Sequence, residues 1–463
     1  MKKAKDVTRR SFLKSATAGI TGLSIAGSGI KSTIAGTKNS LAWSSGDQVN
    51  PQISNNLVVC CHDPQMFKNE QDATVADTFH EQNEVVDTER VETNMDGMAV
   101  NLSGKDDPDE AWAAIFRKPE EKQWDEVKAA IKVNCIYTGI MSRIAIVGKV
   151  CKELIKLGVQ PSNITIYDAC DNAYGSGKYS PYVGNGLPEN IIVSNSVKTG
   201  PHIPVGSSTL KCTDVLAVSS GNSVVYTNDI LVNCSVNKGH GFTDKGGFTL
   251  SLKNHTGTMK FSCPSLQEMI DENKSEVILG GNPVRQQLCI VDSLWAARKG
   301  PFDPPSHLPA RIIMGTFGPA VDIMVVRKIR EELMRASHTE SAIQTILSSF
   351  GISENDLQWK EIEAYDPTSV SRSRIKKSKN NFCMIINGRS KASEIFFQVP
   401  SQVSDIEISD LSGKLIRSMN NISLKGKISW DGLSRTGKQV KTGVYIVRVK
   451  GNGFTQSQRI NVL

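Results

Sequence analysis

The sequence predicts an α/β core with a largely parallel sheet, followed by a small all-β domain at the C-terminal end. Three neighbouring segments predict the core. Residues 127–135 read as a strand that enters a loop, residues 144–157 carry apolar side chains at helical spacing, and residues 163–168 read as a buried strand. A strand, a helix and a strand in this order indicate a βαβ unit, and therefore a parallel sheet covered by helices.

Short alternating runs follow one another after residue 391. Each carries apolar side chains at every second position, and turn residues such as Gly413 and Asp431-Gly432 separate them. This pattern predicts a small antiparallel, immunoglobulin-like β-sandwich over 392–463. The stretch 371–379 before it is rich in Ser, Arg and Lys, which is typical of an exposed linker.

The formal charge of +7 is concentrated at the two ends of the chain. Residues 1–35 carry a net charge of +6 and residues 392–463 carry +5, which leaves −4 for residues 36–391. Basic contacts to phosphate groups supply most of the affinity of a protein for nucleic acid. The mildly acidic core therefore excludes nucleic acid as a partner.

The N-terminus combines basic side chains with a short run of small residues. It contains the segment Thr8-Arg9-Arg10-Ser11-Phe12-Leu13-Lys14, and the run that follows is too short and too Gly-rich to span a membrane. Small residues at Thr33 and Ala35 predict cleavage before Gly36. The segment resembles a twin-arginine (Tat) signal, which implies export of the folded protein through the Tat translocon. Clients of this route often acquire a cofactor before export.

The predicted C-terminal strands are joined by characteristic turn sequences, namely Asp410-Leu-Ser-Gly413, Trp430-Asp431-Gly432 and Thr442-Gly443-Val-Tyr445. This segment resembles the C-terminal sorting domain of type IX secretion clients. The resemblance implies recognition by the outer-membrane secretion machinery, and in that family such domains are commonly removed. We therefore expect an exported protein in the periplasm, at the cell surface or outside the cell.

At 463 residues the chain is long enough for two or three folded units. Five segments are expected in total. They are a Tat signal peptide at 1–35, an N-terminal extension of the core at 36–109, the α/β core domain at 110–345, a helical segment with a basic linker at 346–391, and the C-terminal β-sandwich at 392–463.

Several separate motifs occur in the core. They are Ile131-Lys132-Val-Asn134, the segments 231–242 and 247–257, Asp292 with Gly300-Pro301, and Gly318-Pro-Ala-Val-Asp322. In this order they resemble the uncharacterised family called domain of unknown function 362, over roughly residues 110–335. The resemblance implies an α/β fold and a candidate site, with no reaction attached. The ferredoxin module of many relatives is absent, and Phe261-Ser-Cys263-Pro264 stands where they often have a histidine.

Polar residues in the middle of the core are candidates for substrate binding. Lys238 and Lys253 lie in segments whose sequence is typical of strands. Lysine is seldom fully buried without a partner, so a structural role does not readily explain these two residues. One interpretation is a cleft in which these two ammonium groups hold a small anionic ligand, a carboxylate or a phosphate. Asn254 and Asn134 then fix the orientation of that ligand.

His240 and Asp292 are the candidate catalytic residues, because His240 can act as general acid or base near neutral pH and Asp292 ends an apolar strand-like run. In an alternative interpretation, His240 binds a divalent metal together with Asp292 or Asp322 and leaves a coordination position open. A purely structural alternative leaves His240 at the surface and Lys253-Asn254 at the end of a strand. Asp322 is then an acid near the start of a helix.

The ten cysteines include no C-x-x-C pair, so neither a zinc ribbon nor a ferredoxin cluster is indicated. Most of them lie in apolar stretches, as expected for buried small hydrophobic residues. Cys60, Cys61 and Cys263 are the remaining candidates for holding a metal or an iron–sulfur cluster.

Three functions stay open on this basis. They are an enzyme acting on a small anionic substrate, a metal- or iron–sulfur-binding redox protein, and a non-catalytic cell-surface binding protein. The chain contains no nucleophile elbow and no HExxH motif. The Gly-rich segment 171–178 matches neither a Walker loop nor a dinucleotide fingerprint. Hydrolase and nucleotide-binding functions therefore have no motif behind them.

Overall fold

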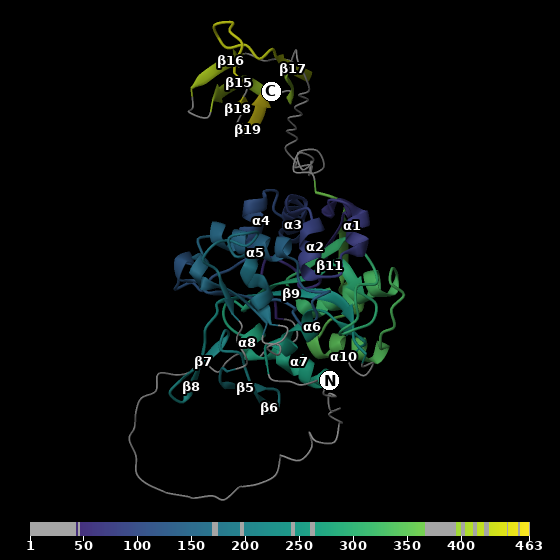
Figure 1. Ribbon diagram of the computed structural model, residues 1–463. Helices are drawn as coiled ribbons and strands as arrows, with labels where there is room; N and C mark the ends of the chain where they lie inside the picture. The colour runs from purple at the N-terminus through teal and green to yellow at the C-terminus, as the bar shows by residue number, and fades with distance from the viewer. Residues whose placement is uncertain are drawn as a thin grey trace, which may run out of the picture.

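A nine-stranded, mostly parallel sheet forms the centre of the protein in the computed structural model (Figure 1). The neighbouring strands follow the order β13-β1-β12-β11-β9-β2-β3-β4, and the short strand β10 pairs with β9. The structure describes residues 43–44, 47–168, 175–194, 199–241, 246–259, 264–365, 395–399, 403–410, 414–420, 426–441, 443–451 and 454–462. The expected Tat signal and basic linker lie outside these residues.

The strands of the central sheet run in two directions. Strands β11, β9, β2, β3 and β4 are mutually parallel, whereas β12 is antiparallel to both β11 and β1. The strands are β1 (Leu57–His62), β2 (Ala129–Lys132), β3 (Ile164–Tyr167), β4 (Ile192–Ser194), β9 (Ile230–Gly239), β10 (Phe248–Thr249), β11 (Gln286–Ala297), β12 (Arg311–Gly315) and β13 (Gln358–Ile362).

The predicted βαβ unit is present at the expected place. Strand β2 leads into helix α5 (Ile144–Lys156), and the chain returns through β3, which pairs with β2 in parallel from Ala129↔Ile164 to Lys132↔Tyr167. Helix α5 buries the apolar positions that the sequence spaces at helical intervals, Ile146, Val150 and Leu154 among them. The α/β class of the core is therefore confirmed.

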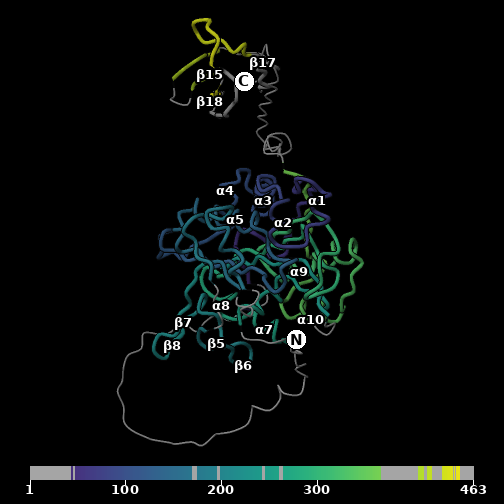
Figure 2. Tube along the Cα trace, viewed as in Figure 1, coloured from purple at the N-terminus to yellow at the C-terminus, as the bar shows by residue number. Residues whose placement is uncertain are grey.

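Two hydrophobic cores lie on the two faces of the sheet, because successive side chains of a strand point to opposite faces. The first core joins the sheet to α3 (Thr88–Ser103), α4 (Pro108–Ile115) and α5. The second joins it to the short helix α6 (Ser251–Asn254) and to α7 (Leu266–Lys274), α8 (Glu276–Leu279), α9 (Gly318–Val325) and α10 (Glu340–Phe350). Figures 1 and 2 show α3, α4 and α5 apart from α7, α8 and α10.

The central sheet extends beyond the core range expected from the sequence. Strand β1 belongs to the expected N-terminal extension, yet it lies inside the sheet between β12 and β13. Strand β13 and the end of α10 belong to the expected helical segment after residue 345. The helices α1 (Glu70–Val75) and α2 (Phe79–Val85) also precede residue 110. Segments from 57 to 362 therefore build one sheet.

Between β4 and β9, the described residues form two hairpins outside this sheet, β5–β6 (His202–Val205 and Ser208–Lys211) and β7–β8 (Ala217–Ser220 and Ser223–Tyr226). Strand β5 packs against α7. Among the described helices, none combines the length and the apolar character that crossing a bilayer requires.

The C-terminal part forms two small antiparallel sheets. One pairs β14 (Ile395–Val399) with β17 (Gly426–Trp430), and the other has the order β16-β15-β18-β19, with β15 (Val403–Asp410), β16 (Leu415–Asn420), β18 (Gly443–Gly451) and β19 (Phe454–Val462). Trp430 of the first sheet contacts Tyr445 of the second, with ring centroids 6.0 Å apart. Ile406, Ile408 and Val447 are fully buried. The predicted all-β character of this part is confirmed.

Candidate functional site

A cavity of about 210 Å³ opens at the carboxyl ends of three adjacent parallel strands, β9, β2 and β3. Ligands of open α/β sheets commonly bind at this edge. Five residues singled out in the sequence as substrate-binding or catalytic side chains line it, namely Asn134, Lys238, His240, Lys253 and Asn254. The other lining residues are Lys132, Ile136, Asp168, Thr249, Thr256, Gly257, Pro301 and Phe302.

The sheet and one helical turn bring these side chains together. Lys238 lies near the end of β9 and His240 directly follows it, whereas Asn134 comes two residues after β2. Lys253 and Asn254 lie in α6, so the prediction of a strand around Lys253 was wrong. Lys253 and Asn254 are consecutive residues of this single helical turn, and both side chains line the cavity.

A chain of hydrogen bonds fixes the amides of the cavity wall. Lys238 Nζ donates to Asn134 Oδ1 at 2.7 Å, and Asn134 Nδ2 donates to Asn254 Oδ1 at 3.0 Å. Asn254 Nδ2 in turn donates to Asn233 Oδ1 at 2.8 Å. The four residues are each less than 10% exposed. Since each amide has one donor and one acceptor side, this chain sets the orientation of every member.

Lys132 and Asp168 form a buried ion pair in the same cavity. Lys132 Nζ lies 3.1 Å from Asp168 Oδ1, and both side chains are at most 1% exposed. Asp168 Oδ2 accepts from the Cys135 N–H at 2.7 Å, and Lys132 Nζ also donates to Asn254 Oδ1 at 3.3 Å. Position 257 in the cavity wall requires a glycine, because a Cβ at Gly257 would collide with Asp168 Oδ1.

The sequence reasoning did not assign a role to Lys132 or Asp168. Both carried a signal, since Lys132 belongs to the motif Ile131-Lys132-Val-Asn134 and Asp168 is the last residue of the predicted buried strand 163–168. Two charges at the ends of neighbouring parallel strands lie at the same edge of the sheet. Once β2 and β3 are known to be parallel neighbours, the positions of Lys132 and Asp168 at their carboxyl ends predict that the two side chains lie close together.

A second histidine, His255, lies beside the amide chain and does not line the cavity. Its Nε2 lies 2.5 Å from Gln286 Oε1, and its Nδ1 lies 3.1 Å from Thr258 Oγ1. Burial lowers the pKa of His255 to about 3, so the imidazole is neutral at ordinary pH. His255 therefore contributes hydrogen bonds to the interior, and His240 is the half-buried imidazole of the cavity.

Asp292 lies apart from the cavity. It shares the face of β11 with Leu288 and Ile290 of the first core, whereas α6 packs in the second core. Its carboxylate accepts from the backbone N–H groups of Arg143 at 2.8 Å and Leu294 at 3.1 Å. Because Arg143 is the N-cap residue of α5, Asp292 stabilises the start of that helix. The structure therefore does not bring Asp292 together with His240.

Asp322 lies beneath the short helix α6 and caps it from a distance of 70 residues in the sequence. Its two oxygens accept from the N–H of Ser251 at 2.8 Å and the N–H of Leu252 at 2.9 Å. Without such acceptors these first N–H groups of the helix would be unsatisfied. Asp322 thus positions the turn that carries Lys253 and Asn254, and it does not lie with His240 in a metal site.

We expect Asp322 to make the stability of the fold depend on pH. Burial raises the pKa of Asp322 to about 7, above its ordinary value of 3.8, so the folded protein retains a proton that the unfolded chain releases. The unfolding free energy of the wild type should therefore fall, relative to Asp322→Asn, as pH rises from about 4 to about 7. Urea unfolding of both proteins measures this difference. A difference that does not change with pH would contradict the prediction.

The predicted cysteine ligands do not form a common site. Cys60 and Cys61 are adjacent in β1, and their side chains lie in the second and the first core respectively, on opposite faces of the sheet. Burial raises the pKa of the Cys61 thiol to about 12, which disfavours the thiolate that metals bind. Cys263 lies outside the described residues. Cys60 and Cys61 therefore cannot ligate one ion together.

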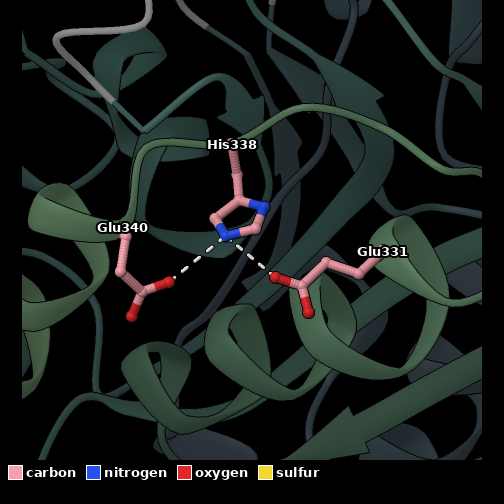
Figure 3. A group of neighbouring side chains, drawn as sticks. All are labelled: Glu331, His338 and Glu340. Atoms are coloured by element: carbon pink, nitrogen blue, oxygen red, sulfur yellow. Dashed lines mark hydrogen bonds and ion pairs between the residues drawn. The ribbon is translucent and has the colours of Figure 1, made fainter.

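Glu331, His338 and Glu340 are the group of described side chains with the spacing to share a metal ion (Figure 3). His338 Nε2 lies 2.8 Å from Glu331 Oε1 and 3.3 Å from Glu340 Oε2. The guanidinium of Arg327 already binds both carboxylates, donating to Glu331 at 2.7 Å and to Glu340 at 2.8 Å. Hydrogen bonds from this guanidinium lower the pKa of Glu340 to about 2. The group therefore acts as an ion-pair cluster that joins the helical segment Val326–Glu331, which follows α9, to the start of α10.

Comparison with known proteins adds little to this geometry. No family model and no curated protein matches the chain. Among solved structures the chain is similar to PorZ of Porphyromonas gingivalis, described as an essential bacterial surface component of the type IX secretion system. The similarity has 21% identity and a TM-score of 0.14, and it covers 15% of this chain and 9% of that chain. A similarity of this extent shows neither the fold nor the family of the chain.

Proposed function

We propose that this chain is an enzyme that binds a small anion, a carboxylate or a phosphate, in the cavity at the ends of β9, β2 and β3. One observation carries the proposal. Three lysines, Lys132, Lys238 and Lys253, line the same cavity together with His240. All three are less than 10% exposed, so their charges act where water screens them weakly.

The roles of the residues follow from their chemistry. Lys238 and Lys253 bind the anion through charge-assisted hydrogen bonds, which are stronger than neutral ones. Asp168 holds the Lys132 side chain in place through the ion pair. Asn134 and Asn254, fixed by the amide chain, orient the ligand. His240, half-buried at the cavity, donates or accepts the proton in the reaction, because imidazole exchanges protons near neutral pH.

Titration calorimetry of the full chain with inorganic phosphate and with acetate, at constant ionic strength, tests the proposal. We expect saturable binding of at least one of them, and we expect His240→Ala to keep its folded far-UV circular dichroism spectrum because that side chain is not part of either core. A wild-type protein that binds neither anion contradicts an anion site. Loss of folding in His240→Ala would contradict a role for His240 limited to the reaction.

We also propose that the core belongs with the family called domain of unknown function 362. The support is that separate motifs of the resemblance supply the lining of one cavity: Lys132 and Asn134 come from the first, Lys238 and His240 from the second, and Lys253 and Asn254 from the third. Ligands of open α/β sheets bind at this edge, so the meeting of three motifs there supports a shared role in binding.

For the C-terminal part we propose an immunoglobulin-like sandwich that serves as a secretion address, after export through the Tat translocon. Its two antiparallel sheets and the contact between Trp430 and Tyr445 support a sandwich. Recognition by the outer-membrane secretion machinery and a final location in the periplasm, at the surface or outside the cell remain part of this proposal. Fractionation of cells that make the full chain, or the chain without 392–463, tests it. An unchanged location after the deletion would contradict it.

A further inference from the structure

We infer that the ligand of this cavity is amphiphilic, a small carboxylate or phosphate monoester that carries a short apolar or aromatic group beside its charge. The inference rests on the proposed anion site and names its substrate class. It follows from three features of the cavity: the apolar residues at its mouth, a hydroxyl in its wall and its size.

The mouth of the cavity is apolar, whereas its interior is charged. Phe302 lines the cavity and is 56% exposed, while Lys132 and Lys238 are each 1% exposed. The charged groups therefore lie deep and the phenyl ring lies at the opening. Pro301 and Ile136, both half-buried, line the cavity together with Phe302.

An exposed phenyl ring beside a charged cavity favours a ligand that covers it. Phe302 lines the cavity together with Pro301 and Ile136, and ligand pockets are lined mainly by apolar and aromatic side chains of this kind. Aromatic and aliphatic groups gain affinity by removing such a ring from water, and offset stacking on the ring adds to this gain. A bare phosphate ion would reach the lysines and leave Phe302 in water.

Thr256 provides a polar group in the wall of the cavity. Its Oγ1 is buried and has no hydrogen-bond partner among the residues that the structure describes. A buried hydroxyl without a partner costs free energy, and a ligand oxygen that accepts or donates a hydrogen bond there removes the cost. An ester or carboxylate oxygen next to the apolar group of the ligand fits this position.

The volume limits the size of the ligand. The cavity has a volume of about 210 Å³. Pockets for larger, drug-sized ligands begin at about 300 Å³. A single ring or a short aliphatic chain with one anionic group fits within this volume.

Two matched pairs of probes test the inference. Inorganic phosphate and phenyl phosphate share the phosphate, and acetate and benzoate share the carboxylate, so calorimetric titration of the full chain with all four separates the head group from the apolar group. We expect the aromatic member of the preferred pair to bind at least about tenfold more tightly than the small member.

Phe302→Ala is expected to remove this advantage and to leave the affinity for the small member unchanged. Leu333→Ala is the matched control, because Leu333 is another exposed apolar residue, 47% exposed, and it does not line the cavity. The Leu333→Ala protein should retain the wild-type preference for the aromatic member. Phe302→Leu keeps an apolar side chain, so its preference should lie between that of the wild type and that of Phe302→Ala.

Each result has a distinct meaning. Equal affinities for the aromatic and the small member in the wild type would overturn the amphiphilic ligand and leave the anion site standing. A preference that survives in Phe302→Ala would also overturn it. Binding of none of the four probes contradicts the proposed anion site itself, and the inference falls with it.

Discussion

Replacing Asp168 by asparagine is expected to lower the free energy of unfolding by about 3–5 kcal/mol, because it leaves the charge of Lys132 buried without its partner. The pair is separated by 3.1 Å, and both side chains are at most 1% exposed, so water screens their attraction only weakly. Asparagine retains an oxygen for the N–H of Cys135. The loss therefore reports on the ion pair. Urea unfolding measures it.

The double variant Lys132→Met with Asp168→Asn is the control. It removes the unpaired charge as well, so we expect it to regain a large part of the stability that Asp168→Asn loses, since buried ion pairs are often replaced by apolar residues at little cost. If the losses of Asp168→Asn and Lys132→Met instead simply add, the two side chains do not interact, and the ion pair is not the cause.

Lys238→Met is expected to weaken binding of the preferred anion about 10- to 100-fold. A hydrogen bond to a charged group contributes about 1.5–3 kcal/mol, and each ~1.4 kcal/mol changes the dissociation constant tenfold. Methionine has a similar length and keeps the apolar contacts of the lysine stem. Calorimetric titration measures the dissociation constant, and circular dichroism verifies that the variant is folded.

Lys105→Met is the matched control for this variant, because Lys105 is exposed on the loop after α3 and does not line the cavity. It loses the same charge and should bind as the wild type. Lys253→Met is the second test if Lys238→Met does not fold, since Lys253 reaches the cavity from α6 and not from the sheet. Equal binding by the wild type and both cavity variants would contradict the assigned roles of the lysines.

The sequence was sufficient for the frame of the core. The spacing of apolar residues predicted β2, α5 and β3, and the rule that ligands collect at the carboxyl ends of parallel strands applies to the positions of Asn134 and Asp168. These are local patterns: each depends on residues within one element or on two elements that follow one another.

Other features depend on contacts between distant segments, and local patterns do not reveal them. Lys253 lies in a single helical turn that Asp322 caps, although Asp322 is 70 residues away in the sequence. The residues next to Lys253 do not predict this cap. The face on which Asp292 lies is set by the pairing of β11 with β9 and β12, and that face belongs to the first core. The position of β13 beside β1 likewise joins segments about 300 residues apart.

The most direct measurement is a crystal structure of the full chain with 4-bromobenzoate, with the bromine located by its anomalous scattering. We predict the carboxylate between Lys238 and Lys253 and the brominated ring against Phe302, because these residues line the same cavity and the lysines are buried whereas Phe302 is exposed. A cavity that stays without the ligand at a concentration that saturates the protein in solution, with bromine found elsewhere on the surface, would contradict the account.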